Sequence, residues 1–294
     1  GKPWVATACQ GLGASVWWPN KDHQSDEVDG MLISVAVPNG LMNVSNGRLV
    51  KTEKMKGGYT KYHWKVDNPI NNYNIALNIA DYAHFQETYA GEKGPLSVDY
   101  YVLQENKDKI AHLKKNANET LKAFEHWFGP YPFYEDSYKL VEAPYLGMEH
   151  QTINAYGNNF QFVPMGKVKY DWLLHHELGH EWWGNLVTNA DWKDMWIHEG
   201  FCSYMQALYQ EDRLGKEAYL EYIHGMRRFT NVLPIAPNEV KTAKEIYRAP
   251  IYNKGAWTLH SLRYLLGDKT FFKVLRKMAY PNAEMEASSD GSAC

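Results

Sequence analysis

Hydrophobic and polar positions alternate in short runs over the first part of the chain, up to Gly94-Pro95. The runs are rich in β-branched and aromatic residues, as is typical of strands, and turn-forming sequences with glycine or asparagine separate them. They lie at residues 5–8, 33–37, 59–66 and 75–79. This pattern predicts a β-rich domain at residues 1–95, forming part of a β-sandwich or a saddle-shaped sheet.

The pattern changes after the predicted boundary, where the periodicity becomes helical. Residues 96–104 and 138–142 still have strand composition, but between them apolar residues recur every three or four positions over residues 107–128. The predicted apolar stripe is Ile110, Leu113, Ala117, Leu121, Phe124 and Phe128. Further helices are predicted around residues 176 and 199 and at residues 218–229, 255–266 and 270–278. We therefore predict an α+β fold, in which a mainly helical domain at residues 96–294 follows the β-rich one.

Two histidines and a glutamate stand together in the sequence His176-Glu177-Leu178-Gly179-His180. Residues i and i+4 lie on one face of a helix, so His176 and His180 can bind a single metal ion. Glu177 lies about 100° round the helix, where it can take a proton from a metal-bound water without ligating the ion. A motif with three fixed positions also arises by chance, so it needs support from its context.

Glu199 supplies that support. It follows His180 after eighteen intervening residues and opens an apolar-periodic stretch, which predicts a second helix with Glu199 in its first turn. Two histidines and one glutamate leave the fourth tetrahedral position open, as in catalytic zinc sites. We predict one Zn²⁺ per chain, with His176, His180 and Glu199 as its ligands.

Four separated segments together resemble the zinc aminopeptidases of the gluzincin family that includes aminopeptidase N. They are HELGHEWWGNLVT at 176–188, WIHEGF at 196–201, LGMEH at 146–150 and YNKGA at 252–256. The third segment is similar to the exopeptidase signature G-x-M-E-N, but Leu146 stands where the family has its first glycine and His150 where it has asparagine. The resemblance implies a thermolysin-like catalytic domain. It also implies that the N-terminal domain is partial and that the catalytic domain is incomplete at its C-terminal end.

The resemblance also implies roles for residues outside the ligand set. Glu149 would bind the substrate amine, assisted by Gln10 and with Gly147 and Met148 beside it. Tyr252 would donate a hydrogen bond from its hydroxyl to the oxyanion. A free α-amine has a pKa of about 7.7–8.0, so it is largely cationic near neutral pH. A carboxylate at the blind end of the cleft would neutralise that charge, so that only the first peptide bond reaches the metal.

These features predict a zinc-dependent aminopeptidase that hydrolyses the N-terminal peptide bond, with zinc-bound water as nucleophile and Glu177 as general base. Two alternatives stay open, because a fold does not fix a function. One is another zinc hydrolase on the same scaffold, an endopeptidase or a small-molecule hydrolase, which would cleave N-blocked substrates equally well. The other is a non-catalytic, zinc-containing peptide-binding module.

Composition narrows the possible partners. The formal net charge is −3, which provides no basic field for nucleic acid. The three cysteines are scattered and suggest neither a disulfide framework nor a metal cluster. Apolar runs stay well short of a membrane span and none opens the chain as a signal peptide would, so we expect a soluble protein. The expected partner is a peptide substrate with a free N-terminus. The compartment and the oligomeric state stay open.

Overall fold

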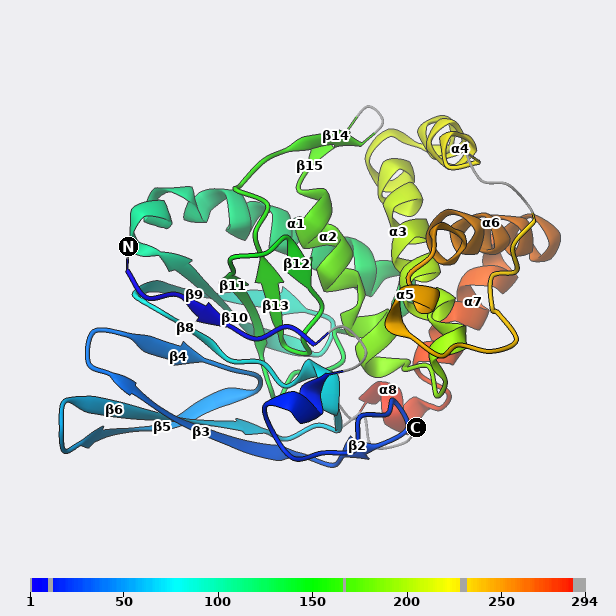
Figure 1. The fold of residues 1–294 in the computed structure, drawn as a ribbon. Coiled ribbons are helices and arrows are strands. Elements are labelled where there is room, and N and C mark those ends of the chain that lie inside the picture. The colour runs from blue at the N-terminus through cyan, green and yellow to red at the C-terminus, as the bar shows by residue number, and fades with distance from the viewer. Residues whose placement is uncertain (1, 10–12, 166–167, 228–231, 288–294) are drawn as a thin grey trace.

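The computed structural model describes residues 2–9, 13–165, 168–227 and 232–287. Strands dominate the first half of the chain and helices the second, as Figure 1 shows. This arrangement confirms the predicted α+β class, with a sheet-rich N-terminal region and a helical C-terminal part. Within the described residues, the helices are too short or too polar to cross a membrane.

The N-terminal region consists of three small antiparallel sheets with strand orders β1-β8-β4, β3-β6-β5 and β2-β7. Their strands are β1 (Val5–Ala6), β2 (Glu27–Val28), β3 (Met31–Pro38), β4 (Met42–Val44), β5 (Arg48–Met55), β6 (Tyr59–Val66), β7 (Ile70–Asn71) and β8 (Asn78–Ala80). The predicted runs at 33–37 and 59–66 lie in β3 and β6, whose alternate residues Ile33, Trp64 and Val66 are buried. Strand β5 escaped prediction because all of its residues are exposed and most are polar.

A five-stranded sheet with the order β12-β13-β11-β10-β9 joins the two parts of the chain. Its strands are β9 (Tyr82–Gly91), β10 (Gly94–Leu103), β11 (Tyr138–Glu142), β12 (Gly147–Met148) and β13 (Ile153–Tyr156). Strands β10, β11 and β13 run parallel, while β9 and β12 pair antiparallel at the two edges. The predicted domain boundary near residue 95 falls inside the β9–β10 hairpin, and the division into domains stays a prediction.

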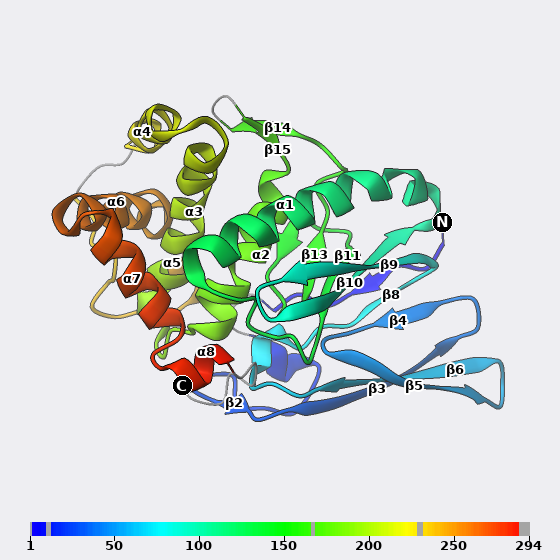
Figure 2. The same ribbon diagram turned by 180° about the vertical axis from the view of Figure 1, so that it is seen from behind.

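Helix α1 (Ile110–Phe128) follows η3 (Gln104–Lys109) and connects β10 to β11. Five of the six residues in its predicted stripe are buried, and Ile110 is partly buried. Figure 2 shows α1 lying along the back of the molecule, beside the five-stranded sheet and α2. The helix ends at Gly129, whose φ of 100° is in the left-handed region that favours glycine.

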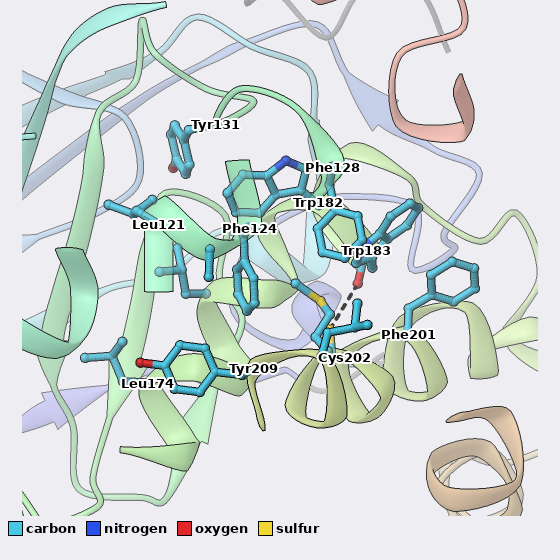
Figure 3. Close-up of a cluster of buried hydrophobic side chains, with 14 of the residues drawn as sticks. Leu121, Phe124, Phe128, Tyr131, Leu174, Trp182, Trp183, Phe201, Cys202 and Tyr209 are labelled. Atoms are coloured by element: carbon cyan, nitrogen blue, oxygen red, sulfur yellow. Dashed lines mark hydrogen bonds between the residues drawn. The ribbon is translucent and has the colours of Figure 1, made fainter. Parts of the chain in front are cut away.

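The helical part is built around α2 (Trp172–Gly179) and α3 (Trp196–Leu214). The side chain of Asp171 caps α2 by accepting the N–H of Leu174 at 3.3 Å. Figure 3 shows aromatic residues of α1 and of the segment after α2 packed over α3 around Cys202, which is fully buried. The remaining strands and α-helices are β14 (Val163–Met165), β15 (Val168–Tyr170), α4 (Lys216–Gly225), α5 (Ala243–Ile246), α6 (Gly255–Leu266), α7 (Asp268–Ala279) and α8 (Ala283–Ala287).

Helices α3 and α6 approach each other closely at two glycines. A Cβ atom on Gly200 would lie 2.9 Å from the Cα of Gly255, and one on Gly255 would lie 2.8 Å from the Cα of Gly200. Real Cβ atoms essentially never come this close to backbone atoms, so both positions require glycine at this helix separation. The contact brings the first turn of α3 next to η6 (Pro250–Lys254), the segment that leads into α6.

Candidate active site

His176 and His180 converge at the C-terminal end of α2, and Glu199 reaches them from the first turn of α3. The two imidazole Nε2 atoms are 3.2 Å apart. Glu199 Oε2 lies 3.2 Å from Nε2 of His176 and 3.6 Å from Nε2 of His180. Ligand atoms of a tetrahedral zinc ion, bound at about 2.0–2.1 Å, would lie about 3.3 Å apart. The three predicted ligands therefore have the spacing of one tetrahedral ion.

The tautomer of His180 also fits a metal ligand. Its Nδ1 lies 3.0 Å from the carbonyl oxygen of Trp183, to which it can only donate, so its Nε2 lone pair faces His176 and Glu199. Trp183 and Gly184 leave helical geometry here and turn that carbonyl back toward the imidazole. Two facing imidazole lone pairs and a buried carboxylate need a cation or protons between them, and this donor set suits a divalent ion.

A second set of possible ligand atoms overlaps the first. Glu149, His180 and His198 also have potential ligand atoms within 4.8 Å of one another. His180 cannot serve both sets, because its Nδ1 is occupied by the carbonyl of Trp183. His198 accepts the backbone N–H of Asn189 through Nε2 at 3.1 Å, and burial lowers its pKa to about 3. These contacts favour the set of His176, His180 and Glu199 as the metal ligands and make His198 a neutral structural residue.

Glu177 faces the same space from α2. Burial raises its pKa well above the usual range, and repulsion from Glu149 adds to this increase. The backbone of Gly147 leaves room for the carboxylate, since a Cβ atom at this position would lie 2.4 Å from Oε1 of Glu177. Gly147 thus lies directly against the candidate general base.

Glu149 lies at the His180 end of the site and is 5 % exposed. Its Oε1 accepts a hydrogen bond from the hydroxyl of Tyr73 at 3.1 Å. Its backbone carbonyl accepts one from Nδ2 of Asn185 at 2.9 Å. Sequence reasoning missed both partners, which lie 76 and 36 residues away along the chain. The one available signal was the asparagine-rich run NPINNYN at residues 68–74, which contains Tyr73.

Two tyrosines approach the site from the segment before α6. Burial raises the pKa of Tyr252 above its usual range, and the negative charge of Glu199 raises it further. Tyr247 was not predicted as a site residue, but burial and then the charges of Glu149 and Glu199 raise its pKa in the same way. Both hydroxyls therefore remain protonated and available as hydrogen-bond donors.

A cavity of about 680 Å³ is lined by Tyr252, Glu149 and the three predicted metal ligands. Its lining includes the polar side chains of Glu149, Glu177 and Glu199, and Leu146, Met148, Trp172, Leu173 and Met226 supply apolar walls. Of the predicted site residues, the cavity is lined by Gly147, Met148, Glu149, His176, Glu177, His180, Glu199 and Tyr252. Gln10, the remaining one, lies outside the described residues.

The fold is that of known metallopeptidases. The structure is similar to the M1 zinc metallopeptidase from Deinococcus radiodurans, with a TM-score of 0.81 and 21 % identity over 95 % of this chain and 62 % of that one. It is also similar to Legionella pneumophila aminopeptidase A in complex with aspartic acid, with a TM-score of 0.75 and 19 % identity over 90 % of this chain and 34 % of that one. Residues 114–288 match the peptidase family M1 domain. The chain belongs to peptidase family M1.

Sequence relatives are named aminopeptidases. Endoplasmic reticulum aminopeptidase 2 of Bos taurus is 29 % identical over 265 residues, covering 82 % of this chain and 27 % of the relative. Aminopeptidase B of Mus musculus is 28 % identical over 294 residues, covering 92 % of this chain and 42 % of the relative. The chain thus spans between 27 % and 42 % of the length of these two relatives.

Proposed function

We propose that this chain carries the catalytic centre of a zinc-dependent aminopeptidase that releases single residues from peptides with a free N-terminus. The observation that carries the proposal is the position of Glu149. Its carboxylate lies within 4.8 Å of possible ligand atoms on His180 and His198, and Glu149 lines the same cavity as the predicted metal ligands. An amine bound there would leave only the first peptide bond beside the metal.

His176, His180 and Glu199 would hold the zinc ion, which when bound polarises the scissile carbonyl and lowers the pKa of a water molecule toward about 7. Glu177 would take a proton from the attacking water and pass it to the leaving amine. Its position suits this role, because it lines the same cavity as the three predicted ligands and Gly147 leaves room for its carboxylate. Tyr252, kept protonated by burial, would donate its hydroxyl to the developing oxyanion.

Glu149 would bind the cationic α-amine of the substrate. It is an acceptor only, and Tyr73 already donates to its Oε1, so Oε2 would be the oxygen that binds the amine. Pairing of a charged group with a buried carboxylate such as that of Glu149 is worth more than pairing at the surface. The carboxylate would therefore select substrates by their free amine and fix the point of cleavage.

The test is hydrolysis of aminoacyl anilides, each assayed beside its N-acetylated counterpart, before and after removal of metal by a chelator and addition of zinc. We expect turnover of the free-amine compounds alone, lost with chelator and restored by zinc. Glu177→Gln is the matched control, because it should retain zinc while turnover falls about 10²- to 10⁴-fold. Equal cleavage of the acetylated compounds would instead favour an endopeptidase. Peptide binding without turnover by either variant would favour a binding module.

A further inference from the structure

The asparagine-rich segment at residues 68–78 is buried against the loop that carries Glu149. Asn68, Asn71, Asn72, Asn74 and Asn78 are each at most 3 % exposed. Within this segment, η2 (Asn72–Asn74) is capped by Asn71, whose side chain accepts the N–H of Tyr73. The side chains of Asn71, Asn72 and Asn78 donate to carbonyls within the sheet-rich region. The side chain of Asn74 instead donates to Asn185, in the helical part of the molecule.

Tyr73 fixes the side chain of Glu149. The tyrosine is 1 % exposed, and its ring packs in a small apolar cluster with Ala143, Met148 and Ala155. Since the ring is enclosed, its hydroxyl has little freedom to move away from Oε1 of Glu149 at 3.1 Å. A carboxylate can only accept in this pair, so the hydroxyl is the donor.

A second connection holds the backbone of Glu149. Nδ2 of Asn74 donates to Oδ1 of Asn185 at 2.9 Å, and Nδ2 of Asn185 donates to the carbonyl of Glu149 at 2.9 Å. Asn46 also connects the asparagine-rich segment to the loop that carries Glu149, because its Nδ2 donates to the carbonyls of Asn74 and Gln151 at 2.8 and 2.7 Å. Glu149 is thus held at its side chain by Tyr73 and at its backbone by Asn74 acting through Asn185.

We propose that Tyr73 is a positioning residue for Glu149, which directs one carboxylate oxygen to the substrate amine by holding the other, with Asn74 fixing the backbone. The inference rests on the proposed aminopeptidase function and deepens it, because it assigns part of the selectivity for free amines to the sheet-rich region. A glutamate side chain loses considerable rotamer freedom when it becomes fixed. Tyr73 imposes that loss before the substrate binds, which strengthens binding of the amine.

The test compares two ligands of the zinc-loaded protein by calorimetry. One is an amino-acid hydroxamate and the other is the same hydroxamate without its α-amine, so only the first can use Glu149. Tyr73→Phe should weaken binding of the amine-bearing ligand roughly ten-fold, the size of one hydrogen bond to a charged group, and leave the other ligand unchanged. In the Glu149→Ala background, Tyr73→Phe should have no further effect.

Tyr82→Phe is the matched control. Tyr82 is 4 % exposed in β9, and its hydroxyl donates to the carbonyl of Glu142 at 2.9 Å, so its removal deletes a buried hydroxyl that makes no contact with Glu149. We expect it to change stability without changing the ratio of the two affinities. Zinc content and the unfolding temperature are measured for every variant.

The outcomes separate the inference from the function on which it rests. If Glu149→Ala weakens only the amine-bearing ligand but Tyr73→Phe weakens both ligands equally or neither, the inference is overturned and the proposed function stands. If Glu149→Ala does not distinguish the ligands, Glu149 is not the amine site and both fail. Should Tyr73→Phe unfold, Asn74→Ser applies the same test through the backbone connection. A loss confined to the amine-bearing ligand supports the inference, and equal losses overturn it.

Discussion

The metal-ligand half of the site and the Glu149 half are held in place by different kinds of interaction. His176, His180 and Glu199 stand on two helices that pack through buried apolar side chains such as Leu178 and Leu208. Glu149 instead stands on a loop between short strands, held by side-chain hydrogen bonds from distant segments. The proposed metal-binding half therefore depends on packing over a large area, whereas the proposed amine-binding half depends on a few polar atoms.

The largest expected contrast comes from deleting one buried side chain in each half. Leu208→Ala should cost about 2–5 kcal/mol of unfolding free energy through the cavity it leaves, with the KM for free-amine substrates unchanged below the melting temperature. Asn46→Ala should cost about 1–3 kcal/mol by leaving buried backbone groups without partners, and should raise that KM. Denaturant unfolding and steady-state kinetics measure both. An equal rise in KM for the two variants would contradict the contrast.

Gly147→Ala tests the contact between the loop that carries Glu149 and helix α2, which carries Glu177. The new Cβ would lie 2.4 Å from Oε1 of Glu177 and 2.7 Å from Cδ1 of Leu173, so the carboxylate must move. We expect kcat to fall roughly 10- to 100-fold, because a displacement of about 1 Å at a catalytic group can cost 10²-fold. Zinc content should stay the same.

Gly225→Ala is the control for this substitution, since a Cβ at this position meets no atom within 4 Å. It should leave kcat unchanged. A wild-type kcat for Gly147→Ala would mean that Glu177 can adjust without losing its function.

The smallest effect concerns Lys139, which connects the two regions of the chain. Its ammonium donates to the carbonyl of Gly47, and burial lowers its pKa from 10.5 to about 8, although Asp99 and Asp136 partly offset the decrease. Between these two values the unfolded chain binds more protons than the folded one, so stability rises with pH. Between pH 7 and pH 8.5, the free energy of unfolding should increase by about 1 kcal/mol more in the wild type than in Lys139→Met. Equal pH slopes in denaturant unfolding would refute the lowered pKa.

The same contrast explains what the sequence could predict. The ligands of the metal half follow from helical periodicity, which places His176 above His180 and Glu199 in a first turn, and such spacing is visible in one sequence. The partners of Glu149 lie far away along the chain, and hydrogen bonds between distant segments leave no periodic trace. Sequence reasoning found Glu149 by resemblance but missed Tyr73 and Asn185.

Strands β5 and β9 were missed for a related reason. Strand β5 has no buried face and so lacks hydrophobic alternation, and in β9 the residues between Tyr82 and Tyr89 are exposed or only partly buried. Both are specified mainly by pairing with a neighbouring strand, a tertiary effect that a local pattern does not contain. The stretch at 75–79 was predicted as a strand, but only residues 78 and 79 belong to β8, and residues 75–77 link it to η2.

The contact between Gly200 and Gly255 has a consequence for attempts to redesign the candidate active site. Glu199 immediately precedes one glycine and Tyr252 lies three residues before the other, so the helix contact links the positions of a proposed metal ligand and a proposed oxyanion donor. Any side chain added at either glycine would push both groups apart together. Laboratory evolution toward new substrates should therefore leave these two glycines unchanged and accumulate its substitutions on the apolar walls, at Trp172 or Met226, where shape can change without disturbing the chemistry.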